Sequence, residues 1–180
     1  MRSRAFTIVE LLIVIVVIAI LAAISVVSYN GIQQRSQTSK IDADLATLGK
    51  AIQAARISSN KVLRDITLAT GGTSPGNTAT TCMSKPANTD LATLNKSTDS
   101  CWTVYTLSLQ RISAASGINV NGLADPWGRP YMIDENEQED TATYGPCGLY
   151  KDVLAVYLRP MTGSWGFTND RPVPYYTPGC

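Results

Sequence analysis

The chain has 180 residues, with 15 basic side chains, 14 acidic side chains and no histidine. Charged residues are 16% of the sequence, whereas typical soluble domains have about 25%. The formal net charge of +1 excludes a strong electrostatic preference for nucleic acid. Without histidine, a phosphate-binding loop or a spaced set of metal ligands, the sequence does not predict an enzyme or a bound cofactor.

The N-terminal part predicts a membrane-spanning helix. Residues 11–34 contain no acidic or basic side chain, and roughly 20 apolar residues cross the hydrocarbon layer. Glu10 lies at the start of this run, and an acidic group inside a span costs about 2.5–3.5 kcal/mol unless it is paired. The next basic residue is Arg35, so no cation within the helix is expected to pair with it. Arg2 and Arg4 predict a cytoplasmic N-terminus, with everything after Tyr29 outside.

Residues 5–11, Ala-Phe-Thr-Ile-Val-Glu-Leu, resemble the class III signal of type IV pilins and type II secretion pseudopilins. In that family a prepilin peptidase cuts just before the Phe, and the new amine is N-methylated. The resemblance implies cleavage between Ala5 and Phe6, although the family usually has Gly where this chain has Ala5. It also implies that Glu10 of one subunit pairs with the Phe6 amine of a neighbour during assembly.

Two other interpretations of this segment stay open. An ordinary secretory signal has an apolar region of roughly 7–15 residues followed by a small-residue cleavage site. The run here is longer, although small residues between Ala19 and Ser25 could supply such a site. A simple membrane anchor fits the length but leaves Glu10 as an unexplained cost.

Beyond the membrane the pattern predicts that one helix continues from Phe6 to about Ser58. Its outer half has an apolar stripe that must be buried, and an extracytoplasmic sheet is expected to cover it. The stripe consists of Ile41, Leu45, Leu48, Ile52 and Ala55. Charged residues, including Lys50 and Arg56, are expected on the other faces. Gly31 predicts a bend or a melted turn, since glycine is a weak helix former.

The four cysteines, Cys82, Cys101, Cys147 and Cys180, all follow the membrane helix. An even number in an oxidising compartment predicts disulfides with three possible connectivities. We favour Cys82 with Cys101, which would staple a loop of low packing power between Gly71 and Asp99. We also favour Cys147 with Cys180, which resembles the C-terminal disulfide-bounded loop of many type IV pilins. No Cys-x-x-Cys spacing supports a metal site or a catalytic site.

A second helix is predicted from Trp102 to Ser116, with Gly117 as its C-terminal cap. Partial alternation in this stretch leaves a strand as the alternative. Next, Asp125-Pro-Trp-Gly128 predicts a turn in which the Asp side chain binds backbone amides and Gly takes a positive φ. A strand from Tyr131 to Asp134 should follow. The segment also resembles the Asp-Pro-Trp-Gly-x-Pro-Tyr sequence of major pseudopilins.

The remaining sequence predicts one acidic loop, one buried strand and an edge. Residues 134–140 have carboxylates and an amide that suit calcium, but a solvated hairpin tip explains them as well, so we do not predict calcium. Residues 153–158 read as a buried strand. Residues 171–180 contain three prolines, which permit an edge strand or loop at most. Four aromatic residues near this end are expected to pack in the core or loops: Trp165, Phe167, Tyr175 and Tyr176.

The predicted fold class is α+β, with a long N-terminal helix packed on an antiparallel sheet of about three strands, the pilin fold. Four parts are expected: a leader (1–5), a transmembrane helix that forms the filament core (6–29), an amphipathic helix (30–58) and an extracytoplasmic head domain (59–180).

The predicted function is that of a structural subunit of a type IV pilus-like filament for adhesion or motility. The resemblance implies the lipid bilayer, prepilin peptidase, like subunits, an inner-membrane platform and a cytoplasmic assembly ATPase as partners. Before assembly the protein would be a single-pass membrane protein. After assembly it would be a subunit of an extracellular pilus or of a periplasmic pseudopilus. A type II secretion pseudopilin is the first alternative. A competence pilin that binds DNA through Lys50, Arg56, Lys61 and Arg64 is a weaker one.

Overall fold

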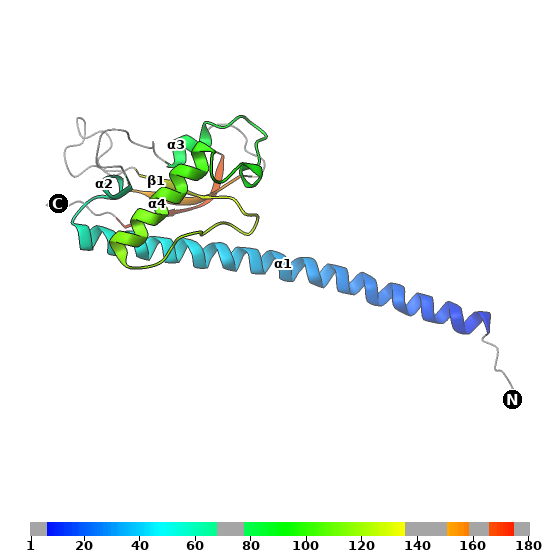
Figure 1. Cartoon of the computed structure of the whole chain (residues 1–180). Coiled ribbons are helices and arrows are strands. Elements are labelled where there is room, and N and C mark those ends of the chain that lie inside the picture. Colours follow the sequence, from blue (N-terminus) through cyan, green and yellow to red (C-terminus); the bar gives the residue numbers. More distant parts are fainter. Residues whose placement is uncertain (1–6, 68–77, 136–150, 159–165, 175–180) are drawn as a thin grey trace. The chain divides into compact units, whose positions relative to one another are not determined.

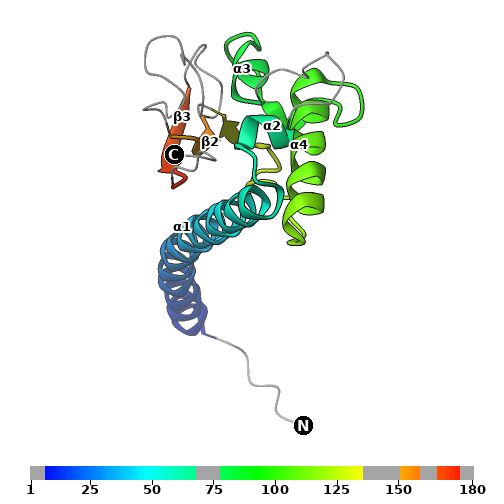
Figure 2. The same cartoon turned by 90° about the vertical axis from the view of Figure 1, so that its left-hand side faces the viewer.

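The computed structural model describes residues 7–67, 78–135, 151–158 and 166–174, without the side chains of 26–28. The chain divides into two units, Met1–Ser39 and Lys40–Cys180, each described here by itself. The elements in chain order are α1 (Ile8–Ser59), α2 (Leu63–Thr67), α3 (Thr78–Met83), the 3₁₀ turn η1 (Leu91–Thr93), α4 (Ser100–Ser116), β1 (Tyr131–Asp134), β2 (Val153–Tyr157) and β3 (Phe167–Pro172). Figure 1 labels the α-helices and β1, and Figure 2 labels β2 and β3.

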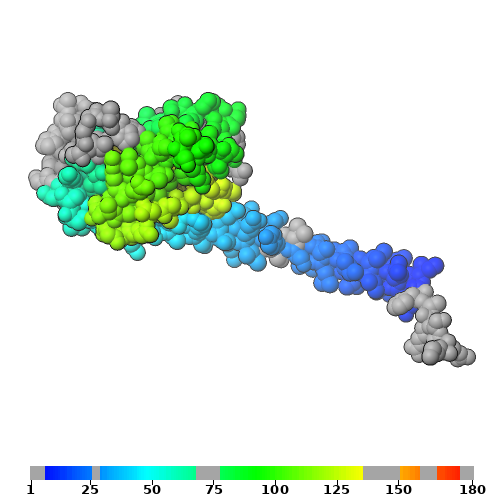
Figure 3. Space-filling view, viewed as in Figure 1, coloured from blue at the N-terminus to red at the C-terminus, as the bar shows by residue number. Residues whose placement is uncertain are grey.

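The first unit consists, in its described residues, of Thr7 and the N-terminal part of α1 up to Ser39, which is apolar from Leu11 to Ile24. Large side chains from Ile8 to Ile24 are exposed along this helix (Figure 3). In the part of the chain that the structure describes, α1 is the one helix long and apolar enough to cross a membrane. The helix is continuous through Gly31, so the melted turn suggested for that position is absent. One exposed glycine lowers the stability of a helix by only about 1 kcal/mol relative to alanine. The hydrogen bonds of the neighbouring turns are enough to keep the helix continuous.

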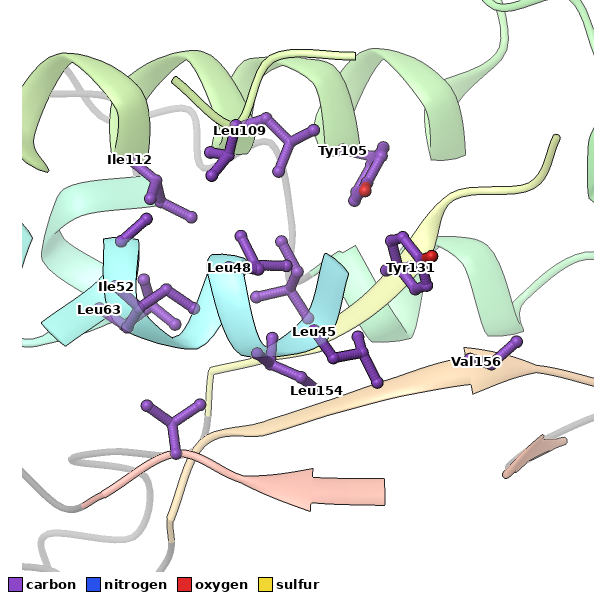
Figure 4. Packing of buried hydrophobic residues seen from close by; sticks show 14 of the residues in the cluster. Leu45, Leu48, Ile52, Leu63, Tyr105, Leu109, Ile112, Tyr131, Leu154 and Val156 are labelled. Carbon is purple, nitrogen blue, oxygen red and sulfur yellow. The ribbon is translucent and has the colours of Figure 1, made fainter. Parts of the chain in front are cut away.

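The second unit is built around the predicted apolar stripe of α1. Figure 2 shows α4 on one side of the end of α1 and the strands β2 and β3 on the other. In Figure 4, Leu48 and Ile52 of α1 lie between Leu109 of α4 and Leu154 of β2. All four side chains are buried in one cluster. The helix therefore buries its stripe against a second helix as well as against the predicted sheet.

The sheet has three antiparallel strands in the order β1-β2-β3. Tyr131 of β1 pairs with Val156 of β2, and both β1 and β2 are almost wholly buried. The register between β2 and β3 shifts between Leu154 and Val156. β3 is an exposed edge strand that ends at Pro172. An edge strand or loop was predicted only for residues 171–180, so the strand at residues 167–170 was not predicted. The predicted α+β fold with a small antiparallel sheet is confirmed.

Helix α4 confirms the helical interpretation of residues 102–116, and the strand alternative is wrong. The Asp99 side chain caps its first turn by accepting a hydrogen bond from the Cys101 backbone N–H. Gly117 ends the helix in the left-handed region with φ 71° and donates its N–H to the Ser113 carbonyl. Two caps of the preferred residue types thus outweigh the short alternating pattern.

The region between Gly71 and Asp99 packs better than we predicted. Residues 68–77 lie outside the described part, but α3 and η1 follow them. Ala79, Cys82 and Met83 of α3 are buried with Met132 and Tyr157 in a second core cluster. The prediction of a loop with little packing power is therefore wrong for the described residues. Its threonines and isolated apolar residues have no helical period, so tertiary contacts select the buried face.

Arg56 is buried, which corrects its predicted place on a polar face of α1. Its side chain forms an ion pair with Asp152, also buried, and Nη1 donates a hydrogen bond to the Pro174 carbonyl at 2.7 Å. Arg56 follows Ile52 by four residues, so it continues the buried stripe. Asp152, which lies just before β2, supplies the counter-charge that a charge in the core requires.

Candidate functional site

At the start of α1, Thr7 and Glu10 hydrogen-bond to each other. Glu10 is the one acidic residue in the sequence of the first unit. The backbone N–H and the hydroxyl of Thr7 both donate to Glu10 Oε2, each at 2.8 Å. In return, the Glu10 backbone N–H donates to Thr7 Oγ1 at 3.2 Å. This is a capping box, in which the spacing Thr-x-x-Glu satisfies N–H groups that a helix start otherwise leaves unpaired.

The capping box was missed in the sequence analysis, although the spacing from Thr7 to Glu10 signals it. The prediction considered only a cation as the partner of Glu10, and the first basic residue after Glu10 is Arg35. The structure adds two neutral donors from Thr7, and the carboxylate also lies at the favourable end of the helix dipole. These interactions solvate the charge but do not neutralise it. Ala5 and Phe6 lie outside the described residues, so their predicted roles stay predictions.

Both Thr7 donors use the same oxygen of Glu10. Within the part of the chain that the structure describes, no group donates to Oε1. Glu10 is exposed, as are the apolar side chains that follow it on α1. The arrangement therefore presents one carboxylate oxygen beside an apolar surface, where a cation from another molecule could pair with it.

The apolar surface of α1 carries no other unsatisfied polar side chain between Leu11 and Ser25. The hydroxyl of Ser25 donates to the Leu21 carbonyl at 2.7 Å, one helical turn earlier. A hydroxyl that bonds within its own helix can enter an apolar environment at low cost. Glu10 is thus the single charged feature of an otherwise apolar helix surface.

A disulfide joins α3 to α4 in the second unit. Cys82 and Cys101 are bonded with an S–S distance of 2.04 Å, and neither residue is exposed. This is the pairing that we favoured from the sequence, and it fixes these two cysteines as structural. Cys147 and Cys180 lie outside the described residues, so their pairing is still a prediction.

The turn before β1 confirms the predicted role of Asp125. Its Oδ1 accepts backbone hydrogen bonds from Trp127 at 3.0 Å and from Arg129 at 2.8 Å, and Gly128 has φ 83°. The sequence analysis missed Arg129, whose Nε donates to Asp125 Oδ2 at 2.7 Å. The Arg129 guanidinium also lies 4.9 Å from the Trp127 ring centroid. The turn is therefore fixed by one carboxylate and one stacked guanidinium.

A group of acidic side chains is buried where β1 ends and β2 begins. Asp134, Glu135 and Asp152 are each less than 9% exposed. Burial, followed by the neighbouring charge of Asp152, raises the pKa of Glu135 to about 8. No three acidic, cysteine or histidine residues of the described part are placed to hold a metal ion. Residues 136–140 of the acidic loop lie outside that part.

The four basic residues considered for DNA do not form one surface. Lys50, Lys61 and Arg64 are exposed, whereas Arg56 is in the core. This removes one of the four predicted phosphate contacts. The spacing Gly-x-Ser-x-Gly occurs at residues 72–76, outside the described residues. A chain without histidine lacks the usual base for such a serine.

Comparison with known proteins gives one finding. The first 26 residues match a family model described as the prokaryotic N-terminal methylation motif. The match includes both Thr7 and Glu10. No curated protein and no solved structure matches the chain.

Proposed function

We propose that the chain is a structural subunit of a type IV pilus-like filament, because its first 26 residues match the prokaryotic N-terminal methylation motif and resemble the class III prepilin signal of type IV pilins and pseudopilins. The observation that carries the proposal is the methylation motif on an exposed apolar helix with one carboxylate, Glu10. The motif implies processing by prepilin peptidase and assembly with other pilin subunits.

Processing would remove residues 1–5 and leave Phe6 as a new N-terminal ammonium, which is then methylated. The leader contains Arg2 and Arg4, so cleavage removes two basic side chains and moves the N-terminal ammonium from Met1 to Phe6, at the helix start. Phe6 stays bonded to Thr7, so the Thr7 N–H that donates to Glu10 survives the cut. The capping box would therefore hold Glu10 in the same orientation before and after cleavage.

During assembly, Glu10 would fix the alignment of neighbouring subunits. Thr7 occupies Oε2, which leaves Oε1 for the Phe6 ammonium of a neighbouring subunit. Within lipid, a charged group is costly until it is paired. An ion pair of this kind adds little net stability, but it penalises every alignment that leaves the carboxylate and the ammonium unpaired.

The filament would grow by head-to-tail packing of α1 helices, which gives an open helical fibre when the rotation does not close. Exposed apolar side chains from Ile8 to Ile24 would exchange lipid contacts for contacts with neighbouring helices. The second unit would face outward as the head. The sequence contains no phosphate-binding loop, so a separate cytoplasmic ATPase, acting through a membrane platform, would supply the energy.

A pseudopilin of type II secretion is the second candidate. The Asp125-Pro-Trp-Gly128 turn supports it, because the segment resembles the Asp-Pro-Trp-Gly-x-Pro-Tyr sequence of major pseudopilins and lies just before β1. The two candidates differ in what a deletion strain loses. Loss of surface fibres supports the pilus, and loss of secreted enzymes supports the pseudopilus. A DNA-uptake role is less favoured, and salt-dependent DNA retention by the protein would test it.

Replacing Glu10 with glutamine tests the proposed assembly step. Gln also completes a capping box, so Glu10→Gln removes the charge and keeps the acceptor for Thr7. We expect normal membrane insertion and cleavage but at least a tenfold loss of filaments in the sheared fraction, measured by immunoblot. Thr7→Ser, which keeps the hydroxyl, is the matched control and should assemble normally. Filaments at the wild-type level in Glu10→Gln would refute the proposed pairing.

A further inference from the structure

One surface turn of the second unit carries a motif that filament assembly does not use. Asn95-Lys96-Ser97 is the single Asn-x-Ser/Thr triplet among the 180 residues. In proteins that face the outside of the cell, this triplet is the acceptor motif for N-linked glycans. The turn lies between η1 and the start of α4, within the chain segment closed by the disulfide from Cys82 to Cys101.

The backbone holds the triplet in a defined turn. The Ser97 N–H donates to Asn95 Oδ1 at 2.9 Å. The Asn95 carbonyl accepts from the backbone N–H of Thr98 at 3.3 Å and of Asp99 at 2.9 Å. Asp99 is the N-cap of α4. The position and orientation of Asn95 are therefore set by a rigid element that begins four residues later.

The two groups that a glycan transferase needs are left available. Asn95 and Ser97 are both exposed. Among the described residues, neither Asn95 Nδ2 nor the Ser97 hydroxyl has a hydrogen-bond partner. Asn95 Oδ1 is occupied by Ser97, so the amide presents its nitrogen to solvent. The nitrogen that would form the bond to the sugar and the hydroxyl that defines the motif are thus both on exposed residues of one turn.

The middle residue of the triplet contacts a buried aromatic ring. Lys96 is exposed, and its Nζ lies 4.5 Å from the centroid of the Trp102 ring. Trp102 is itself buried, and its Nε1 donates to the Leu91 carbonyl at 2.8 Å. The cation–π contact therefore gives the Lys96 side chain a partner other than Asn95.

We propose that Asn95 is an acceptor for an N-linked glycan delivered from a polyprenyl-diphosphate donor. The outward location of the second unit that this requires rests on the proposed function. In the transfer, Nδ2 forms a bond to the anomeric carbon of the first sugar and loses one proton. The bond between that carbon and the diphosphate oxygen breaks, and the lipid diphosphate leaves with the electron pair. No oxidant or reductant is needed.

The variants at Ser97 separate modification from a merely structural turn. Ser97→Ala keeps the backbone N–H that bonds Asn95 Oδ1 but lacks the hydroxyl, so the turn survives and the motif does not. Ser97→Thr keeps both and is the matched control. Asn95→Gln removes the acceptor. A purely structural role predicts that no form of the protein carries a sugar.

The test is peptide mass spectrometry of the full chain purified from its own cells. We expect the peptide containing Asn95 to carry a sugar mass in the wild type and in Ser97→Thr, and to lose it in Ser97→Ala and Asn95→Gln. An unmodified Asn95 in the wild type, or a modified Asn95 in Ser97→Ala, overturns this proposal. The same spectra read the N-terminus, so the two proposals fail separately: a retained Met1 contradicts the proposed filament function, whereas a bare Asn95 contradicts the glycan.

Discussion

The carboxyl group of Glu135 is an acid that the fold prefers to keep protonated. It is 4% exposed, and Oε2 has no partner within the described residues. Its pKa rises from 4.5 unfolded to about 8 folded, chiefly through burial. A raised folded pKa means that the stabilising contribution is fully present below pH 4.5 and is lost as the pH rises through 8.

Glu135→Gln should therefore flatten the stability curve between pH 4.5 and pH 8. We expect the wild-type Tm to fall over this range, and the Tm of the variant, which has no proton to lose, to fall less. Thermal unfolding of the mature chain in detergent, with EDTA present so that no divalent cation compensates, measures this. Parallel curves for the two proteins over this range would show that Glu135 does not control the loss.

The ion pair of Arg56 and Asp152 gives the clearest stability prediction at the residue scale. Arg56→Met removes the guanidinium and leaves the Asp152 carboxylate in the core, which typically costs about 3–5 kcal/mol. The control Lys50→Met changes an exposed charge on the same helix and should alter the free energy of unfolding by less than about 0.5 kcal/mol. Urea titrations compare them, and equal effects of the two variants would contradict the buried pair.

At the scale of elements, α4 depends on the cap that Asp99 provides. Asp99 accepts a hydrogen bond from the Cys101 N–H and pairs with Lys85 at 2.6 Å. Asp99→Ala should lower the free energy of unfolding by about 1–2 kcal/mol, mostly through the lost cap. Asp99→Asn keeps the capping acceptor and should lose only a small part of this, since partly exposed ion pairs contribute little. Equal losses in both would assign the effect to the charge instead.

The elements that the sequence could predict are those whose signal is local. The stripe of α1, the cap at Gly117 and the turn at Asp125 each depend on residues a few positions apart. The site at the start of α1 was predicted only in part, because the prediction considered charged partners of the carboxylate and not the neutral donor Thr7. Helix α3 could not be predicted because its apolar residues have no helical period. The burial of Arg56 could not be predicted because it depends on Asp152, a partner far along the chain.

At the scale of the whole molecule, the proposed function gives the apolar helix the task of assembly and leaves the head to fold on its own core. The apolar part of α1 from Ile8 to Ser25 presents a single carboxylate, that of Glu10. The described head closes its own core with a disulfide and a buried ion pair. Stability of the head and assembly of the filament should then respond to different substitutions. Arg56→Met should weaken the head without preventing cleavage, and Glu10→Gln should stop assembly without changing the Tm of the head.

The identity of the mature N-terminus tests most directly whether the chain is cleaved and methylated as a pilin-like subunit. Mass spectrometry and N-terminal sequencing of the protein recovered from its own membranes would identify the first residue and its modification. The account predicts a chain that begins at an N-methylated Phe6 and lacks residues 1–5. A chain that keeps Met1, or one that begins after a cut between Ala19 and Ser25, would contradict it.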